Sequence, residues 1–329
     1  MTRVTMIVLN LFLAFGLFQA APSRADEPGF DRKEDVIYGR KYGTALTLDV
    51  LTPKANAKGV GVIFMVSGGF VSSHEAIQPV FFKPFLDHGY TVFAVVHGCQ
   101  PRFQVPEIIE DVNRAVRFIR HHAKDYKIDP DRLGVYGASA GGHLSLMLGT
   151  AGKAGDPSAK DPVDRESSRV QAVACFFPPT DWLNFGEPGK ERLRATDFEP
   201  QFSAAFDYRK PDEKTGLWLP IDDPDTRREI ARATSPITHV TPDDPPTLLI
   251  HGDADTLVSI QQSESFEKKL RETGVESRLI VKKGSGHGWV GLDKDLDTFV
   301  EWFDQHLAKP AAAKAAQAAP AGAVEKRPG

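Results

Sequence analysis

The chain has 329 residues, of which 41% are hydrophobic and 26% charged, and its formal net charge is −4. This composition can bury a sizeable core, which excludes a largely disordered protein. The mild negative charge, with no concentrated Lys/Arg run in the central region, argues against nucleic acid as a partner.

The N-terminus has the pattern of a secretory signal peptide. Arg3 gives a short basic start, residues 4–18 form an apolar run, and Ser23-Arg24-Ala25 fits a small-x-small cleavage site. We therefore expect residues 1–25 to be removed and the protein to be secreted or periplasmic, with no membrane contact after cleavage. An uncleaved anchor is the alternative, because the run lies near the short limit for a spanning helix.

Short apolar runs alternate with helical patterns through the central region. Residues 36–50 are expected to form an antiparallel hairpin. Near-continuous apolar runs predict buried strands over residues 60–66, 90–96, 133–136, 170–176, 246–250 and 278–282. Apolar spacing typical of helices falls in residues 106–123, 142–148 and 296–307. This alternation predicts an α/β fold, a doubly wound and mostly parallel sheet flanked by helices.

Two segments depart from this alternation. Residues 182–234 mix Pro, Gly and charged residues with several aromatic residues, and an insertion this long is usually functional. We interpret it as a lid or cap over a binding site; the alternative is a surface excursion whose aromatic residues only anchor it. Residues 310–329 are rich in Ala and Pro and are expected to form a disordered tail. The folded domain is therefore expected over residues 29–308.

The chain has two cysteines, Cys99 and Cys175. Export would permit a disulfide between them, but each lies in or beside an apolar segment, where buried free cysteines are common. Free thiols are the expectation and the pairing stays open. Two cysteines exclude a Cys-rich zinc site or a disulfide scaffold.

The segment Gly137-Ala138-Ser139-Ala140-Gly141-Gly142 carries the strongest chemical signal. It matches Gly-x-Ser-x-Gly, follows a predicted strand and leads into a predicted helix. In such a turn the serine is exposed at the edge of the sheet, and small neighbours are needed because the backbone approaches closely. The helix N-terminus also favours developing negative charge. We therefore predict that Ser139 is a catalytic nucleophile.

A serine nucleophile needs a base, and the base needs an acid that fixes its tautomer. His287 lies in a glycine-rich loop before the last predicted helix, which makes it the candidate base. Asp255 follows the strand predicted at residues 246–250 and is the preferred acid, with Asp253 as the alternative. The chain order Ser139, Asp255, His287 is the order expected for this kind of fold.

The transition state also requires hydrogen-bond donors for an oxyanion. Ala140, directly after the nucleophile, offers one backbone N–H. The segment Ser67-Gly68-Gly69-Phe70 follows the strand predicted at residues 60–66 and lies where further donors are expected. A purely structural turn is the alternative for this segment.

The segments GASAGG, HGDADTLV and the GHGW loop resemble the α/β-hydrolase superfamily. More narrowly, they are similar to carboxylesterases of the hormone-sensitive-lipase-like and bacterial feruloyl/acetylxylan esterase groups. The resemblance covers nearly all of residues 36–307 and implies an eight-stranded sheet, no cofactor and an acyl-enzyme mechanism. It also implies Asp255 as the acid and Gly69 and Phe70 as oxyanion donors. The departure is Ser67, where these groups usually have a histidine.

The predicted function is therefore a secreted serine esterase that cleaves small-molecule or polymer-derived carboxylic esters. Acetyl or phenolic esters of plant polysaccharide are the candidate substrates. The alternatives are a peptidase or arylformamidase, which act on amide bonds, and a non-catalytic binding protein that retains the fold. A metal site is not predicted, because no matched set of supporting residues accompanies His251, Asp253, Asp255 and His287.

Overall fold

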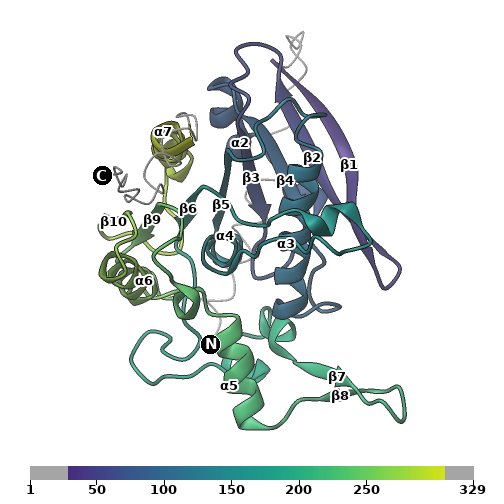
Figure 1. Ribbon diagram of the computed structural model, residues 1–329. Coiled ribbons are helices and arrows are strands. Elements are labelled where there is room, and N and C mark those ends of the chain that lie inside the picture. The colour runs from purple at the N-terminus through teal and green to yellow at the C-terminus, as the bar shows by residue number, and fades with distance from the viewer. Residues whose placement is uncertain (1–28, 308–329) are drawn as a thin grey trace, which may run out of the picture.

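The computed structural model describes residues 29–307 (Figure 1). The signal segment expected at residues 1–25 and the tail expected at residues 310–329 lie outside the described residues. An eight-stranded sheet has the order β1-β2-β4-β3-β5-β6-β9-β10, and its pairs from β4 to β10 are parallel while β1, β2 and β4 pair antiparallel. The strands are β1 (Phe30–Lys41), β2 (Thr44–Pro53), β3 (Gly61–Val66), β4 (Thr91–Val96), β5 (Leu133–Ala138), β6 (Ala172–Phe176), β9 (Thr247–Gly252) and β10 (Ser277–Lys282). The predicted mostly parallel sheet is confirmed.

Helices cover both faces of this sheet. Two of them share one hydrophobic core: α2 (Pro79–Asp87) and α7 (Leu296–Leu307). Three others share the core on the opposite face: α3 (Val105–His121), α4 (Ala140–Ala151) and α6 (Gln261–Glu272). Short 3-10 helices connect these elements: η1 (His74–Ala76), η2 (Pro162–Arg165), η3 (Ala195–Asp197), η4 (Ser203–Phe206), η5 (Pro236–His239) and η6 (Leu292–Asp295). The result is a three-layer arrangement in which the central parallel strands are covered on both sides, as their apolar sequences require, while the edge strand β10 is only partly buried.

The sequence did not indicate two of these helices, α2 and α6. Helix α2 contains Pro79 at its start and Pro84 inside it, and prolines usually argue against a helix. Helix α6 is strongly polar and buries few apolar side chains, chiefly Phe266 and Leu270. Helix α3, in contrast, begins as predicted, with a capping box between Gln104 and Glu107.

Residues 182–234 lie between β6 and β9 in the chain. They contain η3, η4, the hairpin of β7 (Arg209–Pro211) and β8 (Trp218–Pro220), and helix α5 (Pro224–Ala233). Figure 1 shows α5 and the hairpin at the lower end of the molecule, away from α2 and α7. Trp182, Phe185 and Phe206 are buried, so aromatic residues do anchor this segment. Its role as a lid stays a prediction.

Cys99 and Cys175 are both free cysteines, the first partly exposed and the second buried. Among residues 29–307, none of the helices combines the length and apolar character needed to cross a bilayer.

Candidate active site

Ser139 lies on a sharp turn between β5 and α4, with φ 55° and ψ −120°. Few non-glycine residues adopt this region, so the turn is strained. A Cβ on Gly137 would come within 2.5 Å of Gly141 backbone atoms, and a Cβ on Gly141 within 2.5 Å of the Met65 carbonyl oxygen. Glycine is therefore required on both sides of Ser139, which is the physical reason for the motif seen in the sequence.

The structure brings Ser139, His287 and Asp255 into one chain of hydrogen bonds. His287 lies 2.9 Å from the Ser139 hydroxyl through Nε2 and 2.7 Å from Asp255 Oδ2 through Nδ1. Because Nδ1 faces a carboxylate, it carries the proton and donates, which leaves Nε2 to accept the serine proton. Asp253 instead accepts a hydrogen bond from the Gly284 backbone at 2.6 Å. Of the two candidate acids, Asp255 is the one that contacts the imidazole.

The Asp255 carboxylate is held by several donors. Its Oδ1 accepts from the backbone N–H groups of Leu257 at 2.9 Å and Val258 at 3.0 Å. Burial raises its pKa, but hydrogen bonds from His251 and His287 outweigh this effect and hold the pKa well below the ordinary value. Asp255 therefore remains ionised at all moderate pH values and can keep the His287 ring in one tautomer.

His251 is a fully buried residue that supports Asp255, a role the sequence did not indicate. Its Nε2 lies 2.8 Å from the Val258 carbonyl oxygen and 3.2 Å from Asp255 Oδ2, while Nδ1 lies 2.8 Å from the Ser263 hydroxyl. Two oxygen acceptors at Nε2 mean that this nitrogen is protonated and donates.

The segment predicted to supply oxyanion donors forms a tight loop after β3. Gly68 and Val71 exchange backbone hydrogen bonds of 3.0 Å, while Gly69 and Phe70 between them adopt positive φ of 57° and 63°. Ala140 is the first residue of α4, so its N–H has no carbonyl one turn earlier to donate to. Gly69, Phe70, Ser139 and Ala140 line one pocket. The three predicted donors thus lie around the serine.

Residues that follow β4 support this loop. His97 Nε2 lies 2.9 Å from the Ser67 hydroxyl. A histidine that follows β4 therefore contacts Ser67, the position where the sequence departs from the related esterases. Gln100 donates through Nε2 to the carbonyl oxygens of Gly69 at 2.6 Å and Gln201 at 2.9 Å. Its backbone N–H donates to the Phe70 carbonyl oxygen at 3.2 Å. Because Gln100 holds the carbonyl groups of Gly69 and Phe70, it fixes the peptide planes of the oxyanion loop.

Lowering the pH from 7 to 5 is expected to destabilise the fold through His97 and His143. Burial, the main cause, lowers the pKa of each to about 4, whereas an unfolded histidine titrates near 6.5. The unfolded chain therefore binds protons that the folded chain does not, so stability falls as the pH drops from about 6.5 toward 4. At pH 5 the loss is about 2 kcal/mol per histidine.

Urea unfolding at pH 7, 6 and 5 measures this effect. His143→Gln removes one of the two groups and should make the free energy of unfolding less dependent on pH. A wild-type unfolding free energy that is unchanged over this range would contradict the expectation.

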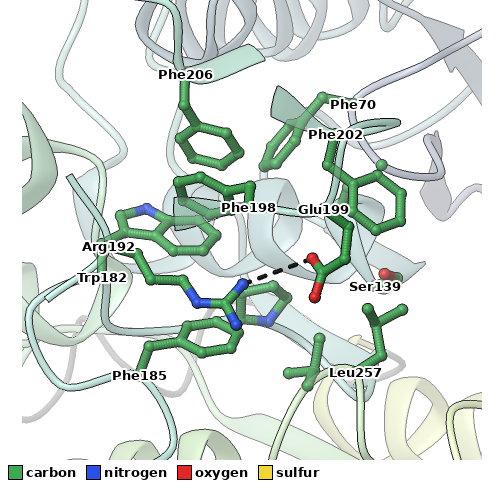
Figure 2. A pocket seen from close by; sticks show the side chains of 14 residues that line it. Phe70, Ser139, Trp182, Phe185, Arg192, Phe198, Glu199, Phe202, Phe206 and Leu257 are labelled. Carbon is green, nitrogen blue, oxygen red and sulfur yellow. Dashed lines mark ion pairs between the residues drawn. The ribbon is translucent and has the colours of Figure 1, made fainter. Parts of the chain in front are cut away.

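A pocket opens beside Ser139 (Figure 2). Its wall is mainly aromatic and includes Phe70, Trp182, Phe185, Phe198, Phe202 and Phe206. Five of these six side chains come from residues 182–234, so this segment supplies most of the aromatic wall. Arg192 and Glu199 also line it and form an ion pair across it, with 3.7 Å between Nη1 and Oε2. Nothing in the local sequence pattern brings Arg192 and Glu199 together, so the sequence did not indicate this pair.

Within residues 29–307, one cluster of side chains offers metal-ligand atoms. Carboxylate oxygens of Glu34 and Asp49 and a ring nitrogen of His74 lie within 4.8 Å of one another. Arg32 already forms ion pairs with both carboxylates, at 3.3 Å and 2.5 Å. This guanidinium supplies the positive charge that a cation would bring, so we assign no metal to the group.

A mostly parallel eight-stranded sheet flanked by helices, with the nucleophile turn after β5, defines a protein of the α/β-hydrolase class. Residues 48–270 match the family model described as BD-FAE. The chain belongs to this family.

Curated relatives of the chain include esterases of Mycobacterium tuberculosis. The chain is 28% identical to the probable carboxylic ester hydrolase LipM, covering 72% of this chain and 51% of LipM. It is 29% identical to the esterase LipC, covering 70% of this chain and 53% of LipC. The chain thus spans about half the length of these relatives.

Solved structures with the same fold include two esterases. A truncated carbohydrate esterase from gut microbiota has a TM-score of 0.67 and 25% identity, covering 86% of this chain and 99% of that one. An esterase of Thermogutta terrifontis has a TM-score of 0.62 and 22% identity, covering 84% and 92%. The second likeness shows the fold alone.

Proposed function

We propose that the protein is a serine esterase that hydrolyses carboxylic esters through Ser139, His287 and Asp255. The observation that carries this proposal is the chain of hydrogen bonds from the serine hydroxyl through both ring nitrogens to a buried carboxylate, at 2.9 Å and 2.7 Å. The esterase names of the relatives LipM and LipC support the same class of reaction.

The reaction proceeds in two steps. His287 Nε2 accepts the Ser139 proton as the hydroxyl oxygen attacks the ester carbonyl, and Asp255 stabilises the resulting imidazolium. The N–H groups of Gly69, Phe70 and Ala140 stabilise the oxyanion. His287 then returns the proton to the departing alcohol, which leaves an acyl group on Ser139. A water molecule, activated by the same histidine, attacks this acyl-enzyme and releases the acid.

The proposed substrates are small or polymer-derived esters, including acetyl or phenolic esters of plant polysaccharide. The name of the carbohydrate esterase with the same fold supports this direction. The signal-like pattern of residues 1–25 supports a secreted or periplasmic location, where such esters are met. The aromatic side chains that residues 182–234 contribute to the pocket support the proposal that this insertion covers the substrate.

Labelling with a fluorophosphonate probe, followed by mass spectrometry, tests the proposal. A single adduct on Ser139, together with turnover of p-nitrophenyl acetate, is the expected result. Comparing the ester with a p-nitroanilide of the same acyl group tests the amidase alternative. A folded protein with neither adduct nor turnover would contradict the proposal and favour a binding role.

A further inference from the structure

The pocket beside Ser139 lies on the acyl side of the proposed reaction. His287 delivers a proton to the leaving alcohol, so the alcohol must lie near its ring. His287 is not among the residues that line the pocket, whereas the oxyanion donors Gly69, Phe70 and Ala140 are. The acyl group, which stays on Ser139 after the alcohol has left, therefore extends into the aromatic pocket.

Arg192 lines this pocket and comes from the insertion. Its guanidinium carbon lies 4.0 Å from the centre of the Phe185 ring and 5.4 Å from that of Phe198. Its backbone N–H donates to the Trp182 carbonyl oxygen at 2.7 Å, which ties it to the pocket wall. The side chain is 19% exposed. The guanidinium is thus packed between aromatic rings rather than extended into solvent.

Glu199 keeps the guanidinium in this position. The two charged groups lie 3.7 Å apart, and Glu199, at 40% exposure, has the more solvated side chain of the two. Figure 2 shows Glu199 between Arg192 and Ser139, so the pair crosses the pocket near the serine. A long acyl chain could enter only by displacing Arg192 from its rings and from its carboxylate partner, which is costly for a largely buried charge.

The remaining space is small. The cavity volume is about 50 Å³, and since each water needs about 10–15 Å³ of such space, it holds on the order of four water-sized groups. We propose that Arg192, held by Glu199, restricts the acyl group to short aliphatic acids of the acetyl-to-butyryl class. This inference rests on the proposed function, and it favours acetyl over phenolic acyl groups, whose rings exceed the space available.

The test measures kcat/KM for p-nitrophenyl acetate, butyrate and octanoate and for methyl ferulate. The wild type is expected to prefer acetate to octanoate by about tenfold or more, and to hydrolyse methyl ferulate poorly. Arg192→Ala should raise the octanoate-to-acetate ratio by about tenfold or more, because it opens space in which further methylene groups are buried. Lys190→Ala is the matched control: it removes an exposed cation of the same loop, paired with Glu187 at 3.4 Å, and should leave the ratio unchanged.

Two results would overturn the inference. One is a wild-type preference for octanoate or methyl ferulate, which needs no variant. The other is an unchanged octanoate-to-acetate ratio in Arg192→Ala, or, should that variant not fold, in Arg192→Met, which keeps an unbranched apolar stem but is shorter than arginine and carries no charge. Failure of the proposed function looks different, because the wild type would then hydrolyse none of these esters and carry no adduct on Ser139.

Discussion

Ser139→Ala is expected to lower kcat for p-nitrophenyl acetate by roughly four to six orders of magnitude. The substitution removes the only atom that forms the acyl bond, while the oxyanion donors and the pocket stay in place. Binding of a non-hydrolysable short-chain amide should therefore persist. Stopped-flow and steady-state kinetics on the purified variant, with circular dichroism to check folding, measure the effect.

The control for this prediction is Ser158→Ala. Ser158 is exposed and its hydroxyl donates to Asp156 at 2.6 Å, so its loss should leave kcat unchanged. A loss of less than about tenfold in Ser139→Ala would contradict the nucleophile assignment, because removing the nucleophile of a serine hydrolase costs on the order of six orders of magnitude in kcat.

Asp255→Asn is expected to lower kcat by about four orders of magnitude while the fold is retained. An asparagine has nearly the shape of the aspartate, and its carbonyl oxygen can still accept the backbone N–H groups of Leu257 and Val258. If its amide NH₂ faces His287, it donates to Nδ1 and moves the ring proton to Nε2. In that tautomer the histidine can no longer accept the proton of Ser139.

Asp253→Asn is the matched control for this second prediction. Asp253 lies two residues away, and its carboxylate contacts the Gly284 backbone at 2.6 Å and the Lys283 ammonium at 3.5 Å. Its variant should keep kcat within about twofold of the wild type. A larger loss in Asp253→Asn than in Asp255→Asn would reverse the assignment of the acid.

Much of the fold was predictable because buried parallel strands carry unusually apolar sequences. Strand β3, for example, is buried at all six positions, and its run of apolar residues stands out in the sequence. The opening strands β1 and β2 extend further than predicted, over Phe30–Lys41 and Thr44–Pro53. Most side chains of β1 are exposed, so its ends lack an apolar pattern that would mark them.

The candidate site was predictable where chemistry imposes a local pattern. The close approach around Ser139 demands glycine at positions 137 and 141, and this demand is visible in the sequence. The supporting residues His97, His251 and Arg192 leave no such mark, because each acts through a contact that only the folded chain creates. His97, for instance, meets Ser67 across 30 residues of sequence.

The side-chain amide of Gln100 couples the position of the insertion to the oxyanion loop. One NH₂ group holds both the carbonyl of Gly69 in the oxyanion loop and the carbonyl of Gln201 in the insertion, and the Phe202 ring lies so close over Gly69 that a Cβ there would meet it at 2.4 Å. Displacing the insertion therefore disturbs the peptide planes that face the reacting oxygen. An acyl group too large for the pocket would therefore lower kcat, because the oxyanion donors would be misplaced at the step where negative charge develops. It would also raise KM.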